Sequence, residues 1–337
     1  MSSGLLVDSV AEARERYWDA VASDDAGAAL EVARGRLADG DDVAGVLDAL
    51  VSQAQRRVGD MWAEGAWTVA REHAATAVSD FVVRSLRNDL PAPDPLRPAL
   101  LVACAEHEWH SLAALMLATT AESAGERVVL LGADVSTQAL QGALLDHPAR
   151  AVLVSSSLTS SLTQVRRHVE TSTSARVPIV VGGRSFDAAG RRARALGATA
   201  QSHGLPDLGE TVRSLPVRVP PQAVMRGEAA SEAAQLSLRV PTLGRQVMAR
   251  LVDTAGAGAD QGSAMWDVVC DQVPTMVGTV AGALVTGDPS VLSDAVAWLR
   301  AVADARGDGE ELVDALLEAM RVVLRDYPLG VAMLRGL

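Results

Sequence analysis

The sequence of 337 residues contains no lysine, although arginine is frequent. This absence excludes a phosphate-binding-loop lysine, a Schiff base to retinal or pyridoxal phosphate, and a catalytic lysine. An arginine-biased genome would explain the absence, but the chemical exclusion holds in either case. Only two cysteines occur, Cys104 and Cys270, and they are far apart in the chain. They provide neither a disulfide framework nor the paired spacing of a zinc site.

Net positive charge and long apolar runs are also lacking. The formal net charge is -12, and duplex nucleic acid is held mainly by cationic side chains, so direct binding to nucleic acid is disfavoured. No helix-turn-helix pattern is visible. No apolar run approaches the roughly 20 residues of a membrane helix, and the N-terminus lacks the pattern of a secretion signal. We therefore expect a cytoplasmic protein without a membrane or nucleic-acid partner.

Three regions with different patterns follow one another along the chain, which predicts a multidomain α and α/β protein. Residues 1–90 have apolar residues at helical spacing and predict a four-helix bundle. In residues 97–215 short apolar strands alternate with helices, which predicts a Rossmann-like parallel sheet with helices on both faces. Residues 216–235 predict a linker. Residues 236–337 predict an all-α bundle of globin-like size, with helices at 236–253, 262–285, 289–304 and 309–326.

Three loops of the predicted sheet carry residues suited to a ligand. Open parallel sheets bind ligands beyond the carboxyl ends of their strands. CAEHEWHSLA follows the first strand, SSSLTSSL the third and GGRSF the fourth. A histidine in the first loop can project towards a ligand, and small residues in the others allow close approach to the backbone.

The segment EWHSLA, residues 108–113, resembles the D/E-x-H-x-x-G signature of base-off/His-on cobalamin domains. The resemblance implies that His110 is the lower axial ligand of cobalt. It also implies that Glu108 hydrogen-bonds the ring, which fixes its tautomer and raises its basicity. Ala113 replaces the final glycine of the signature, which predicts a tighter or shifted fit. The rival ligand His107 has Ala105 where the acid belongs.

Three later segments are similar to the same domains in the same order. They imply further cobalamin-contacting residues after the second, third and fourth strands, with those of the last two along the nucleotide tail. These residues are Gly132, Asp134, Ser155, Thr159, Gly182 and Gly183. The alternative for His110 is an ordinary hydrogen-bonded loop histidine, which would leave the other three matches unexplained.

Residues 62–73, WAEGAWTVAREH, resemble the W-x9-E-H motif of CarH-type cobalamin photoreceptors. The resemblance implies that the helical bundle caps the upper face of adenosylcobalamin with Trp62, Val69, Glu72 and His73. The spacing of positions 62, 69 and 73 predicts that they share one helix face. The alternative is that the tryptophans are ordinary bundle core. Ala63 stands where the repressors of this type commonly carry a histidine, so a second ligand here would require that His73 or another group moves in.

The C-terminal region, joined to a cobalamin domain, resembles the photocobilins, and this implies a linear bilin such as biliverdin. No histidine follows His203, which disfavours imidazole-ligated haem. A bilin needs apolar walls, cations for its propionates and a polar group near its pyrroles. The candidates are Trp266, Asp267, Asp271, Arg245, Arg250, Arg321 and Arg325, with Cys270 as a possible thioether. The alternative is a dimerisation or partner-docking bundle with Trp266 and Trp298 in its core.

Taken together, these resemblances imply a light sensor, not an enzyme, that signals by a conformational or oligomeric change. The partners we expect are the chromophores, further copies of the chain and a downstream signalling protein. Two alternatives stay open: a corrinoid methyl carrier for a methyltransferase, and a cobalamin-binding antirepressor. A mutase is disfavoured because its separate barrel of about 250 residues would not fit in the remaining chain.

Overall fold

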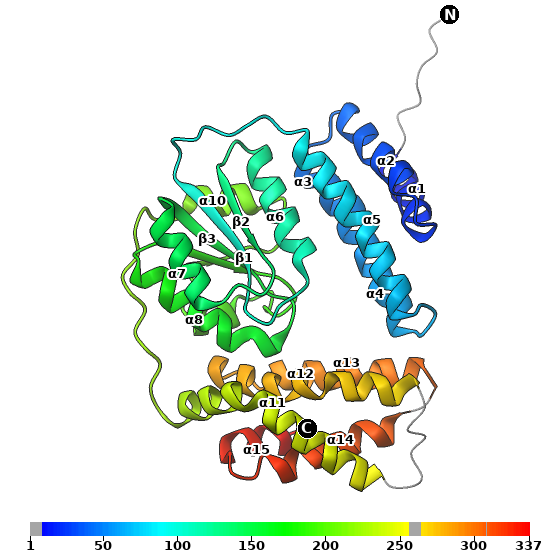
Figure 1. The fold of residues 1–337 in the computed structure, drawn as a ribbon, viewed down its shortest axis with the longest axis vertical. Coiled ribbons are helices and arrows are strands. Elements are labelled where there is room, and N and C mark those ends of the chain that lie inside the picture. The colour runs from blue at the N-terminus through cyan, green and yellow to red at the C-terminus, as the bar shows by residue number, and fades with distance from the viewer. Residues whose placement is uncertain (1–8, 256–263, 308) are drawn as a thin grey trace, which may run out of the picture.

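The computed structural model describes residues 9–255, 264–307 and 309–337. Its first part is the predicted helical bundle, which contains four helical rods (Figure 1). The third rod is continuous but changes from α-helix to π-helix and back again. The bounds are α1 Val10–Ala22, α2 Ala26–Ala38, α3 Val43–Val46 with the π segment Leu47–Ser52 and α4 Gln53–Ala63, and α5 Val69–Asn88.

The bundle helices begin where side chains cap their free amides. Ser9 forms a capping box with Glu12 at the start of α1, and Thr68 accepts from the amide of Arg71 at the start of α5. Inside the bundle Trp18 and Trp67 stack with ring centroids 5.5 Å apart. Local signals and core packing therefore agree in this region.

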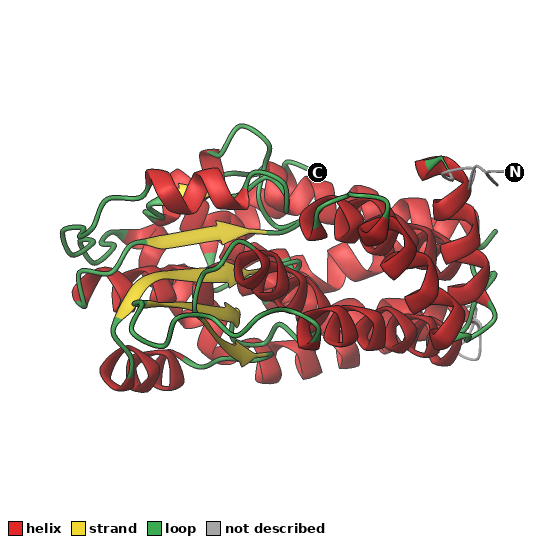
Figure 2. Cartoon of the chain, turned by 90° about the horizontal axis from the view of Figure 1, so that it is seen from above, coloured by secondary structure: helices red, strands yellow, loops and turns green. Residues whose placement is uncertain are grey.

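The second part is a five-stranded parallel sheet with strand order β2-β1-β3-β4-β5. Helices cover both of its faces (Figure 2). One face packs on α6 and α10, and the other on α7, α8 and α9. The predicted fold class is thereby confirmed for this region. The strands are β1 Ala99–Cys104, β2 Val128–Gly132, β3 Ala149–Ser155, β4 Ile179–Gly182 and β5 Ala200–Gln201; the helices are α6 Ser111–Ser123, α7 Thr137–Asp146, α8 Leu162–Ser174, α9 Arg191–Leu196 and α10 Leu208–Ser214.

The third part is all-helical, as predicted, but it differs from the expectation at one helix start and in one additional helix. The first helix starts at Glu228, inside the predicted linker, because its Ala-rich first turns favour helix and Glu232 accepts from two amides of the last helix. That last helix, which begins at Pro328, was not predicted. The bounds are α11 Glu228–Ala255, α12 Ala264–Thr286, α13 Ser290–Ala305, α14 Glu310–Val323 and α15 Pro328–Arg335.

Helix α12 is the core of the C-terminal part. Its segment Met265–Thr286 contains an 18-residue window with a mean hydropathy of 1.5 and is long enough to span a membrane, so the expectation that no run approaches this length was wrong. However, 72% of that window is buried inside the protein, which is the behaviour of a core helix. The helices α12 and α13 lie below both other parts of the chain (Figure 1). The core of the C-terminal part is continuous with the core under α7, α8 and α9.

Candidate functional site

The carboxyl edge of the sheet holds a fully buried carboxylate, Glu108. The exposed fraction of Glu108 is 0%. Its Oε1 accepts from the backbone amide of His110 at 3.1 Å and from Nδ1 of the same residue. Its Oε2 accepts from the amides of Ser157 and Leu158 at 2.7 and 2.9 Å. Burial raises the pKa of Glu108, but these hydrogen bonds and the charge of His110 outweigh it and hold the pKa below its ordinary value.

The ring of His110 is fixed on one side and open on the other. The side chain lies directly before α6 and is 65% exposed. Because Nδ1 donates to Glu108, the remaining nitrogen Nε2 carries the lone pair that a metal would take. The hydrogen bond to Glu108 raises the pKa of His110, and the carboxylates of Glu108 and Glu72 add to this effect. Glu72 belongs to α5, so a charged side chain of the bundle contributes to the electrostatics of this histidine.

The loop before His110 is held by the turn after β2. The carboxylate of Asp134 accepts from the amide of His107 at 2.7 Å, and its own amide donates to the carbonyl of Glu108 at 3.0 Å. Both Asp134 and His107 have positive φ, 49° and 67°, as does Gly132 at 93°. Gly132 and Asp134 therefore shape the loop that carries Glu108 and His110.

The glycine pair at the end of β4, Gly182 and Gly183, packs against the protein's own backbone. A Cβ on Gly183, which has a φ of 111°, would lie 2.8 Å from the carbonyl carbon of Ser156. A Cβ on Gly182 would lie 3.2 Å from the carbonyl oxygen of Ser202. The buried Ser155 ends β3 and its carbonyl accepts from Ala105. The two glycines thus bring neighbouring loops together, whereas we expected them to admit a bulky ligand.

Thr159 lies in a place that the sequence did not indicate. We expected it along the nucleotide tail. In the structure its hydroxyl shares a hydrogen bond of 3.0 Å with Thr279 of α12. Helix α12 packs directly on the turn at Thr159–Ser161, a contact that no local pattern announces, and the expectation that Thr159 lines the tail stays a prediction.

Trp62 and Val69 lie on two different helices. Helix α4 ends at Ala63, Gly65 takes a φ of 73°, and α5 begins at Val69. The prediction of one shared helix face was therefore wrong, since the left-handed glycine and the Thr68 cap break the helix. Glu72 and His73 lie in the first turns of α5, with a distance of 3.3 Å between Oε2 of Glu72 and Nε2 of His73.

Trp62 is engaged by the C-terminal part of the chain. Its ring stacks on that of Trp298 of α13, with centroids 6.1 Å apart and planes 12° apart. The guanidinium of Arg306 lies 5.1 Å from the Trp62 ring centroid and donates to the carbonyls of Trp62 and Ala63 at 2.7 and 3.3 Å. These contacts attach the turn between α4 and α5 to α13.

The residues considered for a bilin are spread over four C-terminal segments. Arg245 and Arg250 are exposed on α11, and Asp267 and Asp271 are exposed on α12, where Trp266 is buried. Two of the other candidates have local roles in the structure. Arg321 donates to the carbonyl of Leu334 at 2.9 and 3.2 Å, and Arg325 lies 4.0 Å from Asp326. Cys270 is partly buried, and burial raises the pKa of its thiol.

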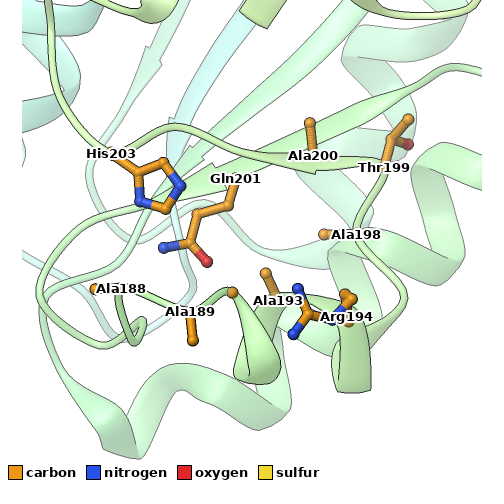
Figure 3. A pocket seen from close by; sticks show the side chains of 10 residues that line it. Ala188, Ala189, Ala193, Arg194, Ala198, Thr199, Ala200, Gln201 and His203 are labelled. Carbon is orange, nitrogen blue, oxygen red and sulfur yellow. The ribbon is translucent and has the colours of Figure 1, made fainter.

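A cavity of about 290 Å³ lies elsewhere, between α9 and the edge strand β5 (Figure 3). Gln201 and His203 line it together with Arg194 and several alanines. The Oε1 atom of Gln201 is buried and has no hydrogen-bond partner within the described residues. None of the residues that we predicted for cobalamin lines this cavity.

The site at His110 offers one nitrogen ligand to a metal. Among the described residues no group of three or more His, Cys, Asp or Glu side chains is arranged to hold a metal ion. A single imidazole with a buried carboxylate behind it suits a metal that arrives inside a macrocycle, because the macrocycle supplies the other ligands. The donor set at Glu108 and His110 therefore fits the cobalt of a corrinoid.

Comparison with known proteins points to the same cofactor. Residues 98–204 match the model of the B12 binding domain, and residues 13–87 match a second model with the same description. These matches support cobalamin binding. They cover the parts of the chain that contain Glu108, His110, Trp62 and Glu72, but not α11 to α15.

The chain is also similar to a transcriptional repressor in sequence and to a corrinoid protein in fold. It is 32% identical over 133 residues to the HTH-type transcriptional repressor CarA of Myxococcus xanthus; this covers 39% of the chain and 43% of the repressor. The fold resembles that of the monomethylamine corrinoid protein of Methanosarcina barkeri, with a TM-score of 0.51 and 17% identity. That match covers 60% of this chain and 98% of the corrinoid protein, so it shows a shared fold over that share of the chain.

Sequence reasoning missed the residues that join the C-terminal part to the site. Trp298 stacks on Trp62, Arg306 donates a hydrogen bond to the carbonyl of Trp62, and Thr279 shares a hydrogen bond with Thr159. One signal was present in the sequence: Gly278 and Gly282 are four residues apart on α12, so they share one helix face and permit a close approach.

Proposed function

We propose that this protein is a light sensor that binds adenosylcobalamin base-off, with His110 as the lower axial ligand. The observation that carries the proposal is the buried Glu108 behind an exposed His110, inside the region that matches the B12 binding domain. Bound adenosylcobalamin supplies a cobalt–carbon bond that light breaks. The chain supplies the ring nitrogen, its orientation and the cap above the cofactor.

Glu108 does three things for the site. It fixes the tautomer of His110, because Nδ1 donates to it and only Nε2 is left for the metal. Its negative charge makes the imidazole a stronger ligand. Its second oxygen holds the loop at Ser157 and Leu158, so the same carboxylate also defines the edge of the site.

The upper side of the cofactor is assigned to the turn between α4 and α5. Trp62, Val69, Glu72 and His73 match the photoreceptor motif, and similarity to the CarA repressor over 133 residues supports this assignment. The carboxylate of Glu72 on α5 adds to the raised pKa of His110, so a charge of the bundle acts on the sheet edge. In our proposal a light-driven change on this side shifts the bundle.

The proposal includes a bilin such as biliverdin in the C-terminal helices. Its support is the resemblance to photocobilins, together with a tryptophan, Trp266, buried in α12. Arg245 and Arg250 on α11 remain candidates for the propionates. Reconstitution with biliverdin tests this part separately: a red-absorbing band that stays with the protein supports it, and its loss on gel filtration removes it.

The signal is proposed to leave the protein as a change of shape or of oligomeric state, read by a further copy or by a cytoplasmic partner protein. Full-length protein loaded with adenosylcobalamin in the dark is run on gel filtration before and after illumination. Free adenosylcobalamin is itself light-sensitive, so the decisive readout is the protein's elution position, with methylcobalamin as a second ligand. A light-dependent elution change supports a sensor. Unchanged elution with both ligands indicates a methyl carrier or an antirepressor.

A further inference from the structure

The loop after β3 is held by two distant parts of the chain. The amides of Ser157 and Leu158 donate to Oε2 of Glu108 at 2.7 and 2.9 Å. The next residue, Thr159, shares a hydrogen bond of 3.0 Å with Thr279 of α12. A short chain of contacts therefore joins the buried carboxylate to the C-terminal helices.

Helix α12 approaches this loop so closely that two of its positions have room only for glycine. A Cβ on Gly282 would overlap the carbonyl oxygen of Thr159, and a Cβ on Gly278 would lie 2.8 Å from Cβ of Ser160. Gly278, Thr279 and Gly282 lie on one side of the helix. We call these three residues the α12 notch. Because the contact is close-packed, a movement of α12 moves the loop with it.

The sheet end of the loop is fixed independently. The carbonyl of Ser156 accepts from the hydroxyl of Ser185 at 2.8 Å, and its amide donates to the carbonyl of Gly182 at 2.9 Å. Beyond Ser156, Glu108 contacts the loop on one side and the α12 notch contacts it on the other. The α12 notch therefore contacts the same loop whose residues Ser157 and Leu158 donate to Glu108.

We propose that the α12 notch is a positioning element for the lower axial ligand. It fixes loop 157–161, the loop fixes Glu108, and Glu108 fixes the ring of His110. The inference rests on the proposed role of His110 as the cobalt ligand. It gives the C-terminal part a role in the cofactor site, although that part lies outside residues 98–204 that match the B12 binding domain.

Two substitutions test the notch, each with a matched control on a C-terminal helix. Gly282→Ala puts a Cβ against Thr159, whereas Gly244→Ala on α11 meets nothing closer than 3.8 Å. Thr279→Val removes the bond to Thr159 and an intrahelical bond to the carbonyl of Thr275. Thr286→Val removes only bonds within α12, so it controls for that second loss.

Two readouts are taken on the full-length chain. The first is amide hydrogen exchange of residues 156–161 in ligand-free protein. The second is binding of hydroxocobalamin to protein that carries nitrogen-15 histidine; the complex is then reduced to cobalt(II) with a chemical reductant, and its electron paramagnetic resonance spectrum shows whether a histidine nitrogen is coordinated. Gly282→Ala and Thr279→Val are expected to speed the exchange and to weaken binding by about tenfold, the lower end of the loss seen when outer-shell partners of a ligand are removed. The controls leave both readouts unchanged.

The outcomes separate this inference from the proposed function. If both notch variants keep wild-type exchange and affinity while the wild type shows nitrogen coordination, the notch has no positioning role and the inference is overturned alone. If wild-type protein shows no coordination by a histidine nitrogen, the role of His110 fails and this inference fails with it. Faster exchange together with weaker nitrogen coordination in both notch variants supports the inference.

Discussion

Trp62 of the bundle and Trp298 of α13 stack face to face, with ring centroids 6.1 Å apart and planes 12° apart. The residue that resembles the photoreceptor cap is thus packed against the C-terminal helices. Arg306 reinforces the contact through the Trp62 ring and its carbonyl. Any change that releases Trp62 is therefore passed to α13.

A double-mutant cycle measures this contact. We expect Trp62→Ala and Trp298→Ala to be coupled by about 1 kcal/mol in the free energy of unfolding, the usual worth of a stacked aromatic pair. Urea denaturation of the wild type, the two single variants and the double variant gives the value. Trp67→Ala, which removes the separate stack with Trp18 inside the bundle, serves as control and is expected to show no coupling to Trp298→Ala. Additive effects of Trp62→Ala and Trp298→Ala would show that the stack contributes nothing to the free energy of unfolding.

The raised pKa of His110 predicts how cobalamin binding depends on pH. Cobalt takes the neutral ring nitrogen, so protons compete with the metal, and binding weakens by about tenfold for each pH unit below the pKa of His110. Glu108→Gln removes the charge that raises this pKa, so the midpoint moves to lower pH. In the ligand-free protein protonated His110 stabilises the fold below its ordinary pKa of 6.5, as long as Glu108 is ionised, and this contribution is lost as pH rises through the raised pKa of His110.

Nuclear magnetic resonance titration of the His110 ring in wild type and Glu108→Gln measures the two midpoints, and hydroxocobalamin titrations at several pH values measure the affinity. Equal midpoints in the two proteins would show that Glu108 does not raise the pKa of His110.

A second histidine predicts acid sensitivity of the fold itself. His168 is fully buried in α8, its Nε2 donates to the carbonyl of Val135 at 2.8 Å, and burial lowers its pKa to about 4. Between the ordinary pKa of 6.5 and about 4 the unfolded chain binds a proton that the folded chain does not. Stability is therefore lost as pH falls through this window, by up to about 3 kcal/mol.

Urea denaturation between pH 7 and pH 4 tests this prediction. His168→Gln removes the titrating group but can keep the hydrogen bond to Val135, so its stability is expected to fall less steeply. An identical slope for the variant and the wild type would assign the acid sensitivity to other groups.

The glycine after β4 is predicted to be intolerant of any side chain. Gly183→Ala combines a φ of 111° with an overlap on the backbone of Ser156, and we expect a loss of about 2 kcal/mol or more in the free energy of unfolding. Gly142→Ala in α7, where nothing lies within 4 Å of the added Cβ, is expected to be neutral or stabilising by up to about 1 kcal/mol. Thermal and urea unfolding measure the stability of both variants. A free energy of unfolding equal to that of the wild type for Gly183→Ala would contradict the packing described for this loop.

Much of the fold follows from local pattern. The alternation of apolar strands and helices predicted the parallel sheet. The contact between Glu108 and His110 could be predicted because the two residues are two positions apart on one loop. The helix break between Trp62 and Val69 had a visible signal in Gly65 and Thr68, but the regular spacing of the motif pointed to one helix instead.

The features that the sequence did not reveal depend on contacts between residues that are distant in the chain. Thr159 and Thr279 are 120 positions apart, and Arg306 and Trp62 are 244 apart. Such packing depends on how finished domains fit together, and no local propensity encodes it. The short helix at Pro328 was missed for a related reason, because its start is held by Glu232 of α11.

The coordination of His110 to cobalt is tested most directly by isotope labelling. Protein made with nitrogen-15 histidine is loaded with cobalamin, reduced to cobalt(II) and studied by electron paramagnetic resonance beside unlabelled protein. The account predicts that the nitrogen splitting changes from triplets to doublets on labelling and disappears in His110→Ala. Triplets that persist in labelled protein would mean that the nucleotide base, and not this histidine, binds the metal.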